Sequence, residues 1–304
     1  MKVVLALVAT CVAVTFGPLP ASAQDNTNLV EPTNSFVPNT HSSGVIQAPL
    51  RNDSNEHIVP VGNLVSSNLP SDAIRTSLGG HITTVPKGSK TYVAGLRATI
   101  DGNNFCSASL ISPTHLLVGT YCVSGNIRWA SIGSHYSNGT QDGEQIKVVA
   151  IMNHPETSGF SNDFAVLKLE KPSSLKPVEL ATADDSDVQD GEWAAKMGWD
   201  DTGGVNTMAY ELQRADVQLM SNENCLKETR VDGSMLCSRG ATNETSCTGD
   251  YGGPVVVERP SGDVLVGVVS WGDDCDKPGY PSIYSRVSSV RAWIASLVGG
   301  ECFH

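Results

Sequence analysis

Basic residues are scarce in this sequence relative to acidic ones. Lysines and arginines number 20 against 32 aspartates and glutamates, which gives a net charge of −12 over 304 residues. Nucleic acids and anionic membrane surfaces are bound through basic patches, so the charge balance argues against both as partners. The length is sufficient for one large domain or two small ones.

Metal-binding patterns are also missing. The chain has eight cysteines but no Cys-x-x-Cys pair, and no group of histidines lies beside them. Structural zinc sites generally need such spacings, so we expect no metal, and no cofactor motif is present. In an oxidising compartment the cysteines are candidates for disulfides instead. Cys11 lies in the leader described next, which leaves an odd number, and we expect Cys302 to be unpaired or to pair between chains.

Long apolar runs are absent except at the start, where Lys2 precedes an apolar stretch from Val3 to Phe16. This stretch is shorter than the roughly 18–20 residues that a membrane span needs. Small residues at Ala21-Ser22-Ala23 form a cleavage site of the signal-peptidase type. We therefore expect residues 1–23 to be a signal peptide and the protein to be secreted. An uncleaved anchor is the alternative.

Residues 24–76 lack cysteine and any sustained hydrophobic period, and they are rich in Asn, Ser, Thr and Pro. Such a composition buries too little apolar surface to offset the entropy of ordering. We expect a disordered pro-segment here, with a small folded module as the alternative. Three Asn-x-Ser/Thr sequons, at Asn52, Asn138 and Asn243, are glycan acceptors in a secreted protein, and each can equally be unused.

From residue 77 onward, short runs of β-branched residues alternate with turns of Gly, Pro and Asn. Many short strands with frequent turn signals predict an all-β barrel or sandwich. A last stretch, from Val287 to Leu297, has its apolar residues at helical spacing. The predicted strands are Thr91–Leu96, Ser109–Ile111, Gln145–Ile151, Phe164–Leu169, Val255–Glu258, Val264–Ser270 and Ser282–Val287.

Three ordered motifs resemble those of the trypsin-like serine proteases. Residues 105–122 resemble the run Cys-Gly-Gly-Ser-Leu-Ile and the later Leu-Thr-Ala-Ala-His-Cys of that family. Residues 162–169 resemble Asn-Asp-Ile-Ala-Leu-Leu-Lys-Leu, and residues 249–254 resemble Gly-Asp-Ser-Gly-Gly-Pro. The resemblance implies that residues 77–304 form two packed six-stranded antiparallel β-barrels with a C-terminal helix. The first barrel would run from about 77 to 190 and the second from about 191 to 290.

The same motifs lack two catalytic residues. Asp163 matches the aspartate of the catalytic triad, but Tyr121 stands where the family has histidine and Tyr251 where it has the nucleophilic serine. Acyl transfer needs a nucleophile with a base beside it. A phenol has a pKa of about 10, so it does not act as a base at neutral pH as imidazole does. We expect no enzymatic activity; a hydrolase of another mechanism is the weaker alternative.

The resemblance also implies features around the degenerate site. Asp163 is expected to be buried and to accept from the Tyr121 hydroxyl or from local backbone amides, with water as the alternative. The cleft residues Tyr121, Tyr251, Thr245 and Trp271 are candidates for a protein interface. Alternatively, the tyrosines only fill an unused cavity and other loops bind the partner. The implied disulfides are Cys106–Cys122, Cys225–Cys237 and Cys247–Cys275.

Two further stretches, residues 85–97 and 110–115, are similar to the glucanase inhibitor proteins that plant-pathogenic oomycetes secrete. Those are protease homologues that bind and inhibit plant endo-β-1,3-glucanases. The resemblance implies a host extracellular endo-β-1,3-glucanase as partner, action in the host apoplast, and suppression of defence elicited by glucan fragments. The alternative is a pseudo-protease with another extracellular partner, such as a protease cofactor or an adhesin.

Overall fold

The structure is a computed structural model that describes residues 82–199, 209–239, 251–271 and 280–299. The expected signal peptide and pro-segment lie outside these ranges. No helix within the described part of the chain is long and apolar enough to cross a membrane.

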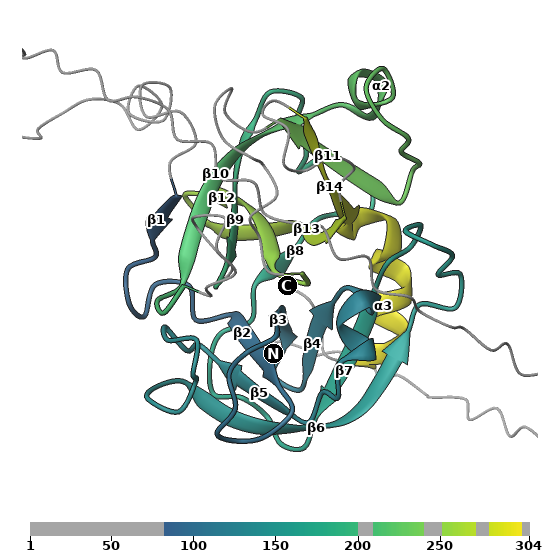
Figure 1. The fold of residues 1–304 in the computed structure, drawn as a ribbon. Coiled ribbons are helices and arrows are strands. Elements are labelled where there is room, and N and C mark those ends of the chain that lie inside the picture. The colour runs from purple at the N-terminus through teal and green to yellow at the C-terminus, as the bar shows by residue number, and fades with distance from the viewer. Residues whose placement is uncertain (1–81, 200–208, 240–250, 272–279, 300–304) are drawn as a thin grey trace, which may run out of the picture. The chain divides into compact units, whose positions relative to one another are not determined.

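Residues 93–169 form a closed antiparallel barrel of six strands, drawn in blue to teal in Figure 1. Its strands carry small and apolar side chains, and β2, β3 and β4 are buried along their whole length. The barrel closes because β2 pairs with β3 on one edge and with β5 on the other. In order around the barrel, the strands are β2 (Val93–Arg97), β3 (Cys106–Ser112), β4 (His115–Val118), β7 (Ala165–Leu169), β6 (Glu144–Asn153) and β5 (Trp129–Ile132).

A second ring of six antiparallel strands follows, in green to yellow. It closes because β9 pairs with both β10 and β12. The two rings confirm the predicted double-barrel architecture. In order, the strands are β9 (Trp193–Gly198), β10 (Gln213–Met220), β11 (Met235–Arg239), β14 (Pro281–Arg286), β13 (Gly262–Trp271) and β12 (Pro254–Arg259).

Two short strands that were expected in the first barrel belong to the sheet of the second. β1 (Ile82–Thr84) pairs with β10, and β8 (Glu179–Leu180) pairs in parallel with β13. Both precede residue 190, yet both extend the sheet of the second barrel. From Ile82 onward, the described chain therefore pairs first with the second barrel, then forms the first barrel, and pairs with the second again through β8 before it enters β9.

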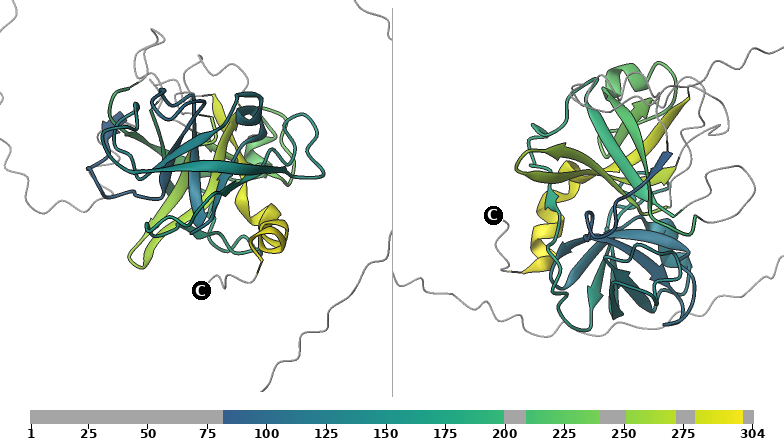
Figure 2. Two further views of the ribbon diagram at one scale, coloured as in Figure 1. Left: turned by 90° about the horizontal axis from the view of Figure 1, so that it is seen from below. Right: turned by 90° about the vertical axis from the view of Figure 1, so that its left-hand side faces the viewer.

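The C-terminal helix is confirmed as well. It starts as a single 3-10 turn, η2 (Val287–Val290), and continues as α3 (Arg291–Val298). The helix ends at Gly299, whose φ of 42° is left-handed and suits glycine. Val287, Ile294 and Val298 are buried in the one large apolar core that both barrels share. α3 lies along one flank of the barrels in every view (Figure 1 and Figure 2).

A polar network ties the approach to β2 to the second barrel. The Lys90 ammonium lies 2.6 Å from a Glu258 oxygen and 2.7 Å from an Asp263 oxygen. The Tyr92 hydroxyl donates to Asp263 at 2.6 Å, and Arg214 donates to both Glu258 oxygens at 3.0 Å. Burial alone would raise the pKa of Glu258, but the hydrogen bonds and charges of Arg214 and Lys90 lower it to about 2. Glu258 is thus held as a carboxylate between two cations.

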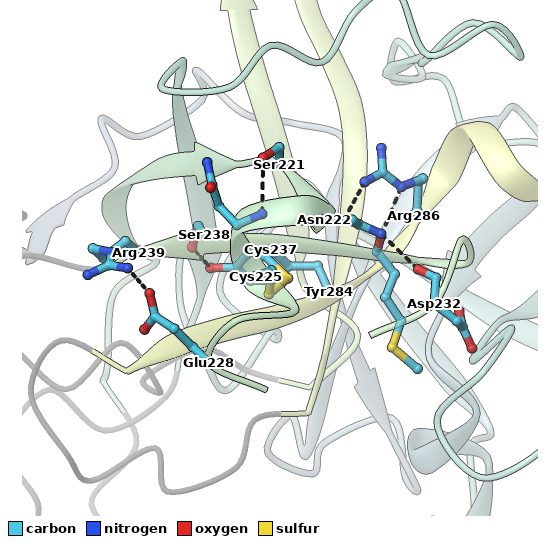
Figure 3. The surroundings of a disulfide bond; sticks show 12 residues. Ser221, Asn222, Cys225, Glu228, Asp232, Cys237, Ser238, Arg239, Tyr284 and Arg286 are labelled. Atoms are coloured by element: carbon cyan, nitrogen blue, oxygen red, sulfur yellow. Dashed lines mark hydrogen bonds and ion pairs between the residues drawn. A yellow bond between two sulfur atoms is a disulfide. The ribbon is translucent and has the colours of Figure 1, made fainter. Parts of the chain in front are cut away.

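Both disulfides that fall on described residues are present. Cys106–Cys122 joins β3 to the turn after β4, and Cys225–Cys237 joins α2 (Asn222–Cys225) to β11. Figure 3 shows the second bond, with α2 packed over β11 and β14. Hydrogen bonds surround this disulfide. The Ser221 hydroxyl caps α2 by accepting from the Asn224 backbone amide, and Arg286 donates to the Asn222 side chain at 2.8 Å. The third expected pair, Cys247–Cys275, lies outside the described residues, as does Cys302.

Candidate functional site

Tyr121 lies on a short 3-10 turn, η1 (Thr120–Ser124), which follows β4. The disulfide from Cys122 to Cys106 fixes this turn against β3, with 6.0 Å between the two Cα atoms. The turn begins after Gly119, where a Cβ would lie 3.2 Å from an oxygen of Asp163. The tyrosine side chain itself points outward and is 63% exposed.

Asp163 is buried just ahead of β7, with 4% of its surface exposed. One carboxylate oxygen accepts from the backbone amide of Thr120 at 2.7 Å and from the Thr120 hydroxyl, and the other accepts from the Ser270 hydroxyl. These donors satisfy a carboxylate that would otherwise be costly to bury. The expectation of a local backbone amide is confirmed. The alternative donor, the Tyr121 hydroxyl, is wrong, because that side chain lies at the surface.

Tyr251 precedes β12 of the second barrel, and its ring packs against the ring of Tyr121, which follows β4 of the first barrel. Its carbonyl accepts from the Ser107 amide at 3.0 Å, and the next amide, that of Gly252, donates to Val269 at 2.9 Å. Gly252 has φ of 83°, and a Cβ there would lie 2.3 Å from the Ser107 oxygen, so the turn requires glycine. The Tyr251 ring is 44% exposed and lies 4.5 Å from the Tyr121 ring, centroid to centroid, at 40°.

The structure therefore gathers the three motif positions into one site between the barrels, with a buried carboxylate below two exposed phenol rings. The decisive sequence comparison agrees with this geometry: the sequence profile of the trypsin family matches residues 80–294. The chain belongs to the trypsin family.

Several relatives within the trypsin family share one name. The chain is 52% identical to glucanase inhibitor protein 3 of Phytophthora infestans over 233 residues, which is 74% of this chain and 89% of the relative. Identity to glucanase inhibitor protein 1 of the same organism is 46%, over 70% of this chain and 85% of the relative. Glucanase inhibitor protein 2 of Phytophthora sojae is 41% identical over 75% and 82%. Both sequence resemblances are thereby confirmed.

The remaining residues singled out from the sequence divide into two groups. Asn138 is described: it lies half-buried between β5 and β6, and its carbonyl accepts from Arg97 at 3.1 Å. Trp271 is the last residue of β13. The positions outside the described residues are Thr245, Asn52 and Asn243. No group of three or more metal-ligating side chains occurs among the residues that the structure describes.

Sequence reasoning missed the two side chains that hold Asp163. Ser270 directly precedes Trp271, but residue spacing gives it no role toward Asp163. Thr120 carries no signal in a single sequence, because it stands where the family pattern has alanine. Only the fold brings both hydroxyls to one carboxylate. The retained aspartate is therefore positioned by the chain without a histidine beside it.

Proposed function

We propose that this trypsin-family chain is a secreted, proteolytically inactive protein that binds and inhibits a host extracellular endo-β-1,3-glucanase. The observation that carries the proposal is the 52% identity to a relative named glucanase inhibitor protein, together with tyrosine at both reactive positions of the site. In the proposal, residues 1–23 direct secretion, residues 24–76 form a pro-segment, and the protein acts in the apoplast, where it suppresses glucan-elicited defence.

Inactivity in this proposal follows from the chemistry of the site. Tyr121 and Tyr251 supply neither a base for neutral pH nor an activated nucleophile, and the Asp163 carboxylate is occupied by Thr120 and Ser270. Without an acyl transfer step, any inhibition must come from binding alone.

The exposed rings support a role in that binding. If the two tyrosines only filled an unused cavity they would be buried, but they are 63% and 44% exposed. Tyrosine offers a large apolar area with a polar tip and is enriched at binding hot spots. We therefore propose Tyr121 and Tyr251 as anchors of the partner interface, and Thr245 and Trp271 as further candidates for it.

The test is an inhibition assay. Purified protein is titrated into a plant endo-β-1,3-glucanase, and the release of reducing sugar from laminarin is followed. The proposal expects saturable loss of activity with neither protein cleaved, as judged by intact mass. Full glucanase activity at saturating protein, across several host isoforms, would refute it. A pull-down from apoplastic fluid, read by mass spectrometry, then distinguishes a glucanase from another extracellular partner.

A further inference from the structure

Each of the seven tyrosines in the chain lies in the part that the structure describes. Tyr92 and Tyr284 are buried, with 7% and 1% of their surfaces exposed, and Tyr280 is half-buried. The other four form two ring pairs at the surface. These are Tyr121–Tyr251, with centroids 4.5 Å apart, and Tyr136–Tyr210, with centroids 5.0 Å apart.

The backbone holds the first pair together. Tyr121 adjoins Cys122, whose disulfide partner is Cys106, and Tyr251 accepts a hydrogen bond from Ser107, the next residue of β3. Both tyrosines are thus anchored to consecutive residues of one buried strand. Their rings are neighbours, and both side chains are exposed. The pair is therefore preorganised on the backbone and accessible from solvent.

We propose that Tyr121 and Tyr251 form an oxidative cross-linking site, converted to dityrosine by hydrogen peroxide and a haem peroxidase. Each phenol loses one electron and its hydroxyl proton, and the two radicals join through ring carbons ortho to the oxygens. Each coupled carbon then passes its hydrogen to the oxygen of its own ring as the ring regains aromaticity. The protein loses two hydrogens in total, and one peroxide is reduced to two waters.

The second pair is a built-in comparison. Tyr136 is half-buried, and the Lys87 ammonium lies 4.7 Å from its ring centroid. A cation over the ring opposes removal of an electron from it. The hydroxyl of Tyr210 is engaged by Gln141. This pair should therefore react more slowly, although its rings are nearly as close.

The cross-link would join the turn after β4 of the first barrel to the segment before β12 of the second. It would fix the two exposed rings of the cleft to each other. The inference concerns the reactivity of this site and does not depend on glucanase inhibition, so either proposal can fail without the other.

The experiment treats the purified protein, at low concentration, with a haem peroxidase and one equivalent of hydrogen peroxide. The monomer fraction is isolated and measured by dityrosine fluorescence and by mass spectrometry of its proteolytic fragments. We expect a linked pair of fragments that contain Tyr121 and Tyr251, two hydrogens lighter than their sum. Tyr121→Phe and Tyr251→Phe should each remove most of the monomer's fluorescence, whereas the matched control Tyr210→Phe should retain most of it.

Three results would overturn the proposal. They are a fluorescence signal that survives Tyr251→Phe in the monomer, a linked fragment pair from Tyr136 and Tyr210 in place of the expected one, and dityrosine that forms only between separate molecules. Phenylalanine keeps the ring and its packing, and circular dichroism of each variant checks that the fold is unchanged before oxidation.

Discussion

The site has two regions, one buried and one exposed. In the buried region, the Asp163 carboxylate is 4% exposed and accepts hydrogen bonds from Thr120 and Ser270. In the exposed region, the Tyr121 and Tyr251 rings are 63% and 44% exposed and lie 4.5 Å apart, centroid to centroid. The buried region keeps the framework of a trypsin-family site, and the exposed region carries the residues that differ from it. A buried polar group constrains its neighbours through hydrogen bonds, whereas an exposed side chain can be replaced without disturbing the fold. This difference is consistent with a trypsin-family fold that has tyrosine at both of these positions.

The largest effect should come from cutting the disulfide that fixes the Tyr121 turn against β3. Replacing Cys106 and Cys122 together by alanine opens a bond that spans 16 residues and should lower the free energy of unfolding by about 3 kcal/mol. Urea denaturation measures this loss. The matched variant without Cys225 and Cys237 should lose a similar amount but leave the Tyr121–Tyr251 pair in place. Equal disturbance of the tyrosines in both variants would contradict the assignment.

Removing the buried carboxylate should cost slightly less. Asp163→Ala leaves the Thr120 amide and the Ser270 hydroxyl without their acceptor, which should lower the free energy of unfolding by about 2–3 kcal/mol. Asp163→Asn keeps an acceptor for Thr120 and should lose about half of that. Thermal or urea denaturation of the two variants gives the comparison. If Asp163→Ala were as stable as the wild type, the buried region would not be the framework described here.

Acid should weaken the network that ties β2 to the second barrel. The folded pKa of Glu258 is lowered from 4.5 to about 2, so its stabilisation is complete above pH 4.5 and is lost as the pH falls toward 2. Its size is on the order of 2–3 kcal/mol. Stability of the wild type and of Glu258→Gln should converge as the pH drops from 6 to about 2. The control is Glu170→Gln, which removes an exposed ion pair with Lys147 and should show no such convergence. Unfolding free energies of the wild type and Glu258→Gln that stay equally far apart from pH 6 to about 2 would contradict a role for the Glu258 carboxylate in stability.

The smallest effect on stability is expected at the exposed region. Tyr121→Ala and Tyr251→Ala each remove an exposed ring, so each should change the free energy of unfolding by no more than about 0.5–1 kcal/mol. Differential scanning calorimetry is sufficient to see this. A loss above about 3 kcal/mol, typical of a core aromatic, would show that the tyrosines belong to the framework instead.

The sequence predicted the motifs and the fold they imply better than it predicted individual strands. β7, β12 and β13 were predicted because Val and Leu dominate their sequences. β5 and β9 were missed, since Trp129–Ile132 and Trp193–Gly198 contain alanine and polar residues and lack a run of β-branched residues. Pairing with neighbouring strands of the same barrel makes them strands. The path of β1 and β8 to the second barrel has no local signal at all.

For the site, ordered motifs were enough to place Tyr121, Asp163 and Tyr251 together. The sequence did not predict that Thr120 and Ser270 would bond the aspartate while Tyr121 turns to solvent. That choice depends on side-chain orientation around a tight turn, which residue spacing does not encode. It also separates the two regions of the site. Tyr121 stands where the family has the histidine that bonds the aspartate, but Thr120 and Ser270 donate to Asp163 instead.

The most direct test of this account is the inhibition constant of the Tyr121→Ala/Tyr251→Ala variant against a plant endo-β-1,3-glucanase, measured by laminarin hydrolysis beside the wild type. With the fold intact, the account predicts inhibition weaker by roughly tenfold to a hundredfold, or about 1–3 kcal/mol, because two exposed anchors are removed. Tyr210→Ala, which removes an exposed ring outside the site, should inhibit as the wild type does. An unchanged inhibition constant in the double variant would contradict the account and place the interface on other loops.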